Sequence, residues 1–237
     1  MNLNQRIEHW LSDNKKAFRL LDRPFVTLSY AQSLHGSIAM RCDEPLALSG
    51  EESLRLTHQL RSIHDGILVG IGTVLSDDPQ LTVRHWIGHN PQPIVLDTQL
   101  RIPAKASLCC RSDKRCWVLT TVDGDGTVIE GLEITALEGS PDGRVCLQRA
   151  LKLLWERGIK SLMVEGGASV ISAFLKARLV DALVLTITPQ FVGGYKAVND
   201  LGNASGCALP QLKPFFSEQL GNDLIVWGNV HYGDIAA

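Results

Sequence analysis

The stretch DGILVGIGTVLSDDPQLTVR, residues 65–84, decides the fold class of this chain. Ile67, Leu68 and Val69 form a short apolar run, which is typical of a strand covered on both faces in the centre of a sheet. Gly70 and Gly72 follow, and glycine lets the backbone turn sharply and approach a ligand closely. A buried strand, a glycine turn and a short helix predict one unit of an α/β sheet with a ligand near the turn.

The same glycine turn has a simpler interpretation. A Gly-x-Gly after a strand is often only a tight turn. Leu75 stands where a dinucleotide-binding G-x-G-x-x-G motif has its third glycine. We therefore expect no Rossmann cofactor loop at this position.

The first 23 residues predict a helical extension. Apolar side chains recur there at helical spacing: Leu3, Ile7, Trp10 and Leu11. One face of this helix is expected to pack on the rest of the protein or on a partner. No linker, charge block or internal repeat divides residues 24–237, which are expected to form a single domain.

Strands and helices alternate after the extension. Strands are expected at 25–31, 66–69, 94–97, 117–121, 127–135, 161–164 and 182–188, with one or two more near the C-terminus. Helices are expected at 49–63, from 142 or 143 to 158, and at 168–178. The first of them is predicted to begin with a capping box, because Ser49 precedes Glu52 by three residues. The alternation predicts a mostly parallel α/β sheet with helices on both faces.

Composition argues against several classes of protein. A net charge of −2 is unlike that of domains that hold nucleic acid through a basic surface. The apolar stretches are too short to cross a bilayer, and the N-terminal residues lack the apolar core of a signal peptide, so we expect a cytoplasmic protein with no membrane partner. The six cysteines have no C-x-x-C spacing, so we expect reduced thiols and no metal site.

A second glycine turn, Glu165-Gly166-Gly167, follows the strand expected at 161–164. Glycines before a helix are often only a turn, but the N–H groups at a helix N-terminus also favour an anion. An acid at the carboxyl end of a buried strand favours a site, because ligands of α/β sheets bind just beyond those ends. Glu165 is then a hydrogen-bond acceptor in a cleft, and its alternative role is to cap the following helix.

Together, these motifs resemble the RibD C-terminal reductases of riboflavin biosynthesis. The matching segments occur in the order of that family, at 24–39, 65–84, 93–103, 161–185 and 187–194. The resemblance implies a dihydrofolate-reductase-like fold with antiparallel C-terminal strands, and a homodimer. It also implies NADPH-dependent reduction of the ribosyl group of a 5-phosphoribosylamino-pyrimidine to the ribitylamino compound. It does not decide between the diaminopyrimidinone and the aminouracil.

The resemblance further implies the residues of the site. Contacts with substrate are implied for Arg61, Leu81, Arg84 and Glu165, and Glu165 is also the catalytic candidate that orients the sugar or passes a proton through water. Contacts with NADPH are implied for Thr73, Asp77, Thr98, Gly167, Ala168, Ser169, Val170, Ile171, Ser172 and Ala173. Two guanidinium groups suit a sugar phosphate, although each arginine taken alone is an ordinary surface cation. Our candidate for the 2′-phosphate is Arg101, three residues after Thr98.

The chain departs from the family pattern at two places. His35 stands in a turn where the family has aspartate, and it is either a tolerated turn residue or a new acid. Pro45 and Ala47 stand where fused bacterial members have a serine and a tryptophan that contact the ligands. The zinc-deaminase signature of bifunctional members is missing from the sequence.

Two alternatives to the pyrimidine reductase therefore stay open. The first is a dihydrofolate-reductase-like enzyme that reduces another heterocycle, because a fold does not determine its substrate. The second is a non-catalytic paralogue that kept the fold, which His35 suggests. Oxidation of NADPH with different substrates would distinguish the three.

Overall fold

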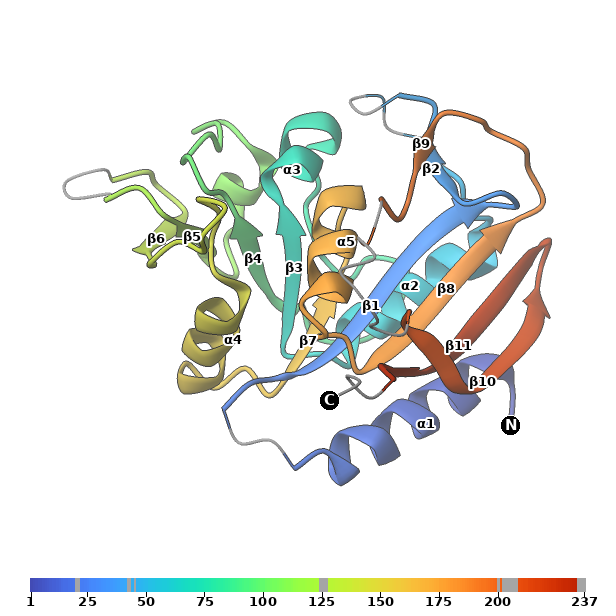
Figure 1. Ribbon diagram of the computed structural model, residues 1–237. Helices are drawn as coiled ribbons and strands as arrows, with labels where there is room; N and C mark the ends of the chain where they lie inside the picture. Colours follow the sequence, from blue (N-terminus) through green and yellow to red (C-terminus); the bar gives the residue numbers. More distant parts are fainter. Residues whose placement is uncertain are drawn as a thin grey trace.

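The computed structural model describes residues 1–19, 22–41, 44, 46–123, 128–199, 201 and 209–233. Within these ranges one sheet has the strand order β10-β11-β8-β1-β7-β3-β4-β5-β6, and β2 pairs with β9 beside it (Figure 1). The elements are α1 (Leu3–Ala17), β1 (Phe25–Ser33), β2 (Ser37–Ala39), α2 (Glu51–Ser62), β3 (Gly66–Gly70), α3 (Ile71–Asp77), β4 (Gln92–Leu96), the 3₁₀ helix η1 (Ser107–Cys110), β5 (Cys116–Thr120), β6 (Leu132–Ala136), α4 (Leu147–Glu156), β7 (Ser161–Val164), α5 (Ala168–Lys176), β8 (Ala182–Thr188), β9 (Tyr195–Lys196), β10 (Gln211–Leu220) and β11 (Asp223–His231).

The sheet is parallel from β8 through β1, β7, β3, β4 and β5 to β6. At its other edge, β11 runs antiparallel to β8, and β10 runs antiparallel to β11. The predicted mostly parallel sheet with antiparallel C-terminal strands is therefore confirmed.

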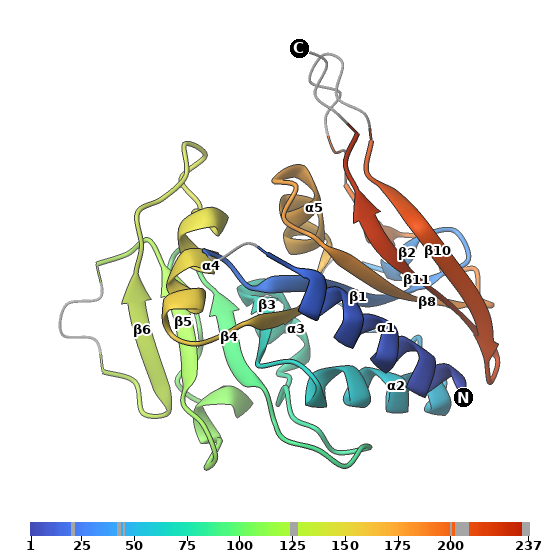
Figure 2. The ribbon, with the colours of Figure 1, turned by 90° about the horizontal axis from the view of Figure 1, so that it is seen from below.

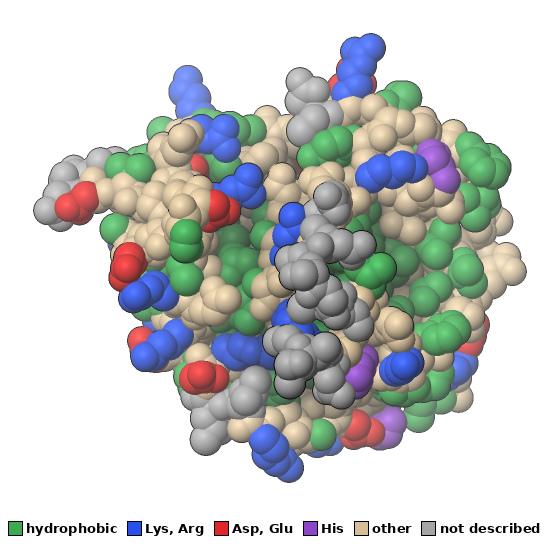
Figure 3. All heavy atoms as spheres, in the orientation of Figure 1, with side chains coloured by type: hydrophobic (Ala, Val, Ile, Leu, Met, Phe, Trp, Pro, Cys, Tyr) green, Lys and Arg blue, Asp and Glu red, His purple; other side chains and the backbone are tan. Residues whose placement is uncertain are grey.

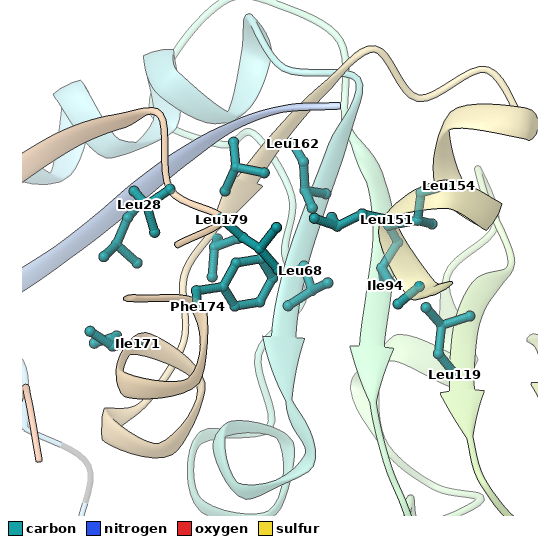
Figure 4. Close-up of a cluster of buried hydrophobic side chains, with 14 of the residues drawn as sticks. Leu28, Leu68, Ile94, Leu119, Leu151, Leu154, Leu162, Ile171, Phe174 and Leu179 are labelled. Carbon is teal, nitrogen blue, oxygen red and sulfur yellow. The ribbon is translucent and has the colours of Figure 1, made fainter. Parts of the chain in front are cut away.

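Helices cover both faces of the sheet, as Figure 2 shows. Helices α4 and α5 lie on one face, and α1, α2 and α3 lie on the other. Successive residues of a strand point to opposite faces, so Leu68 of β3 enters the core under α5 while its neighbours Ile67 and Val69 enter the core under α3. In the first of these cores, Phe174 of α5 packs with Leu68 and Leu162 (Figure 4).

The N-terminal extension forms the predicted helix, α1. Its buried residues Leu3, Ile7 and Leu11 pack in one cluster with side chains of α2, β8 and β11. Polar bonds join α1 to α2 as well: Asn4 Nδ2 donates to Gln59 Oε1 at 2.7 Å. Helix α2 carries Arg61, so the extension supports an element of the expected site.

Two predicted helix starts are wrong. Helix α2 begins at Glu51 with Gly50 as N-cap and no side-chain cap, because the carboxylate of Asp223 takes the Gly50 N–H at 2.8 Å in place of Ser49. Helix α4 begins at Leu147, because residues 140–144 form a turn in which Ser140 N donates to Arg144 O at 2.7 Å.

No described helix has both the length and the apolar character needed to cross a membrane. On the face shown in Figure 3, lysine and arginine side chains are interspersed with acidic ones and do not gather into one basic surface.

Candidate functional site

The site is built where β3 and β7 end beside each other. These strands are parallel neighbours, and each is followed by a glycine turn and a helix, α3 after β3 and α5 after β7. The turn after β7 stays attached to β3, because Glu165 N donates to Leu68 O at 3.0 Å. A Cβ atom on Gly167 would lie 3.8 Å from Thr73 Oγ1. The structure thus brings together Thr73, Glu165 and Gly167, which lie far apart in the sequence.

The glycines of the two turns have different roles. A Cβ on Gly70 would lie 2.7 Å from Cγ2 of Val170, and one on Gly166 would lie 2.5 Å from Cβ of Val170. These two glycines therefore allow α5 to pack closely, which is a structural reason for them. A Cβ on Gly72 would meet nothing within 4 Å, and the main chain is open to a ligand there and at Gly167.

Arg61 and Glu165 form a bidentate ion pair. Nε of Arg61 donates to Oε1 of Glu165 at 2.8 Å, and Nη2 donates to Oε2 at 2.7 Å. The side chains are 12% and 16% exposed, so water weakens the pair little. Although burial lowers the pKa of Arg61, the charge and hydrogen bonds of Glu165 raise it overall. Glu165 does not cap α5, whose N-cap Gly167 has no side-chain cap, so that alternative is wrong.

Arg84 lies close enough to this pair to feel its charges. Burial and the charge of Arg61 lower the pKa of Arg84, and the charge of Glu165 opposes them. Nη1 of Arg84 donates to Thr82 Oγ1 at 2.7 Å, while its Nε and Nη2 make no hydrogen bond within the described residues. Leu81, with φ of +51°, is 2% exposed and packs in the core under α3, so only its main chain is available to a ligand.

The residues expected to contact a cofactor differ in what they expose. On α5, Ala168, Ile171 and Ser172 are buried, so they present no side chain to a ligand, whereas Ser169, Val170 and Ala173 reach the surface. Asp77 is exposed at the end of α3. Thr98 follows β4, and its carbonyl accepts a hydrogen bond from Thr121 Oγ1 at 3.0 Å. Arg101 is exposed beyond it. Contacts of these residues with a cofactor stay a prediction.

His35 is held within its turn. Its Nε2 accepts the N–H of Gly193 at 2.9 Å, so a neutral ring carries its proton on Nδ1, which lies 3.1 Å from Ser33 Oγ. A carboxylate can fill the same acceptor role, so the contacts favour a tolerated turn residue over a new acid. Ala47 is exposed, and Pro45 lies outside the described residues.

Sequence reasoning missed His58, which touches the site. Its Nδ1 accepts the main-chain N–H of Arg84 at 3.1 Å, and the side chain is fully buried. A signal was present in the sequence, because His58 lies three residues before Arg61 on α2 and so shares its helix face.

Comparison with known proteins gives a consistent family. Residues 24–226 match the RibD C-terminal domain. The 2,5-diamino-6-ribosylamino-4(3H)-pyrimidinone 5′-phosphate reductase of Debaryomyces hansenii is 40% identical over 191 residues, 73% of this chain and 77% of the relative. The reductase of the same name from Archaeoglobus fulgidus is 35% identical over 182 residues, 73% of this chain and 83% of the relative.

Longer relatives and solved structures match as well. The riboflavin biosynthesis protein RibD of Aquifex aeolicus is 32% identical over 87% of this chain, which spans only 58% of that relative. The structure of the riboflavin biosynthesis reductase of Saccharomyces cerevisiae superposes with a TM-score of 0.80 and 28% identity, and covers 98% of this chain and all of its own. With the family matched over most of its length, the chain belongs to the RibD C-terminal domain family.

Proposed function

We propose that this protein is an NADPH-dependent pyrimidine reductase of riboflavin biosynthesis. Its substrate is proposed to be 2,5-diamino-6-ribosylamino-4(3H)-pyrimidinone 5′-phosphate, the compound in the names of its relatives from Debaryomyces hansenii and Archaeoglobus fulgidus. The observation that carries the proposal is the bidentate pair of Arg61 and Glu165 at the end of β7, with Arg84 beside it.

The charged residues suit a phosphorylated sugar. The guanidinium of Arg84 keeps donors on Nε and Nη2 that no described residue uses, and a phosphate group accepts such donors in a bidentate manner. Each carboxylate oxygen of Glu165 accepts one bond from Arg61 and retains a lone pair for a hydroxyl of the sugar. Arg61 therefore orients Glu165 without using up its capacity to accept.

The turns suit a nicotinamide dinucleotide. The main chain is open at Gly72 and Gly167, and α5 starts at Gly167 with no side chain on its first N–H groups. Such a helix N-terminus favours the pyrophosphate of a dinucleotide, and Thr73 Oγ1 lies beside it. NADPH, when bound, supplies the hydride for the reduction. The residues of the chain then have to align the sugar with it and to keep the sugar hydroxyls hydrogen-bonded.

The wider organisation follows the same family. We propose that residues 24–237 form one reductase domain and that residues 1–23 are an extension packed on it through α1. We also propose a cytoplasmic homodimer, as the resemblance implies.

Turnover of the purified protein tests the function. NADPH absorbance should fall with the diaminopyrimidinone ribosyl phosphate, more slowly with the aminouracil, and not with dihydrofolate. The same assay with NADH tests the preference for NADPH. Oxidation with dihydrofolate alone would favour a reductase of another heterocycle. Tight NADPH binding without oxidation would favour a non-catalytic paralogue.

A further inference from the structure

Residues 80–84 form neither helix nor strand, yet their main chain is held from several directions. The bonds all come from side chains outside the segment: Arg111 Nη1 to the carbonyls of Gln80 and Leu81 at 3.1 and 3.2 Å, Arg61 Nη1 to the carbonyl of Thr82 at 3.0 Å, Asn90 Oδ1 from Val83 N at 2.7 Å, and His58 Nδ1 from Arg84 N at 3.1 Å. We name this segment the substrate loop, because it carries Leu81 and Arg84. Its shape is set by these side chains and not by a regular element.

His58 holds the end of the substrate loop that carries the cation. A main-chain N–H can only donate, so Nδ1 of His58 is an acceptor and a neutral ring carries its proton on Nε2. Burial lowers the pKa of His58 to about 4, helped by the charges of Arg61, Arg84 and His85, while a bond with the main chain of Thr82 opposes them. The ring is therefore neutral at physiological pH and remains able to accept.

His64 shows what a purely structural histidine looks like in the same helix region. It is buried, and both nitrogens have partners: Nδ1 lies 2.7 Å from Leu60 O and Nε2 lies 2.8 Å from Thr27 Oγ1. His58 differs, because its Nε2 is buried with no hydrogen-bond partner among the described residues. An unsatisfied buried donor is unfavourable and calls for an explanation. The bond from Nδ1 to the substrate loop supplies one.

We propose that His58 is a positioning residue of this enzyme: it fixes the main chain of Arg84 and thereby holds that guanidinium beside Arg61 and Glu165 before substrate binds. The inference rests on the proposed function for its kinetic consequences only. The placement of Arg84 itself is a property of the free protein and can be measured without turnover.

Three substitutions separate the two ring nitrogens. His58→Asn keeps an acceptor oxygen near the position of Nδ1, His58→Gln keeps a polar group near the position of Nε2, and His58→Leu keeps neither. His89→Asn is the matched control, because His89 is exposed near the substrate loop and outside the site. For each protein we would measure amide hydrogen exchange at Arg84, then kcat and the KM values for the pyrimidine and for NADPH.

We expect His58→Leu to speed exchange of the Arg84 amide and to raise the KM for the pyrimidine about tenfold, as for loss of a buried hydrogen bond, with the KM for NADPH unchanged. His58→Asn should restore slow exchange and most of the affinity, and His58→Gln should not. Equal rescue by Gln and Asn, or slow exchange in His58→Leu, would overturn the inference. If the wild type turns over no pyrimidine, the proposed function fails, while the exchange data still decide the role of His58.

Discussion

At the scale of single residues, the pairing of Arg61 with Glu165 could not be predicted. Each residue was identified from its motif, but 104 positions separate them, and no local pattern says that the two side chains meet. His58 was overlooked because a histidine within an amphipathic helix is usually a core residue. Only the structure reveals that its acceptor nitrogen faces the main chain of Arg84.

Substituting Glu165 tests its role as the acceptor for the sugar. Glu165→Gln replaces one of two acceptor oxygens by an NH₂ group that faces the donors of Arg61, so it loses a charge and a hydrogen bond. We expect kcat/KM to fall by roughly ten- to a hundredfold, measured by NADPH oxidation. Glu156→Gln, on the exposed end of α4, is the control and should be unaffected. Full turnover by Glu165→Gln would exclude the role.

At the scale of elements, strands were predicted more reliably than helix starts. Buried strands such as β7 are apolar throughout, and this pattern is local. The N-terminus of α2 was mispredicted because its cap comes from Asp223, 173 residues away. The start of α4 was mispredicted because Val145 is buried as part of a turn, where it pairs with Gly139, and not on a helical face.

The packing of α5 gives a prediction that separates structure from binding. Gly166→Ala places a methyl group against Val170, so we expect it to lower the free energy of unfolding by about 1–3 kcal/mol, partly restored by Val170→Ala. Gly167→Ala meets only Thr73 Oγ1 at 3.8 Å and has an ordinary φ of −72°, so stability should hold while the KM for NADPH rises. Urea unfolding and steady-state kinetics measure the two effects. Equal loss of stability in both variants would contradict this assignment.

At the scale of the whole molecule, the two buried histidines make stability depend on pH. The pKa of His58 is lowered to about 4 and that of His64 well below its usual value, mainly by burial. Between about pH 6.5 and pH 4 the unfolded chain therefore binds protons that the native protein does not, and the free energy of unfolding falls as pH falls.

Urea unfolding at about pH 7 and about pH 5 measures this loss. His58→Asn cannot take up a proton, so its stability should depend less on pH than that of the wild type. His89→Asn removes an exposed histidine and should follow the wild type. A wild-type stability that is constant across this interval would show that these rings already bind protons in the native state.

The manner in which residues 80–84 are held has a consequence for redesign. Arg111, Asn90 and His58 grip carbonyl and amide groups, which every residue except proline offers alike. Positions 80 and 83 can thus be randomised in a library without displacing the neighbouring guanidinium, provided that proline is omitted at 83. Variants with altered preference among sugar phosphates are best sought there, because such changes leave the scaffold intact.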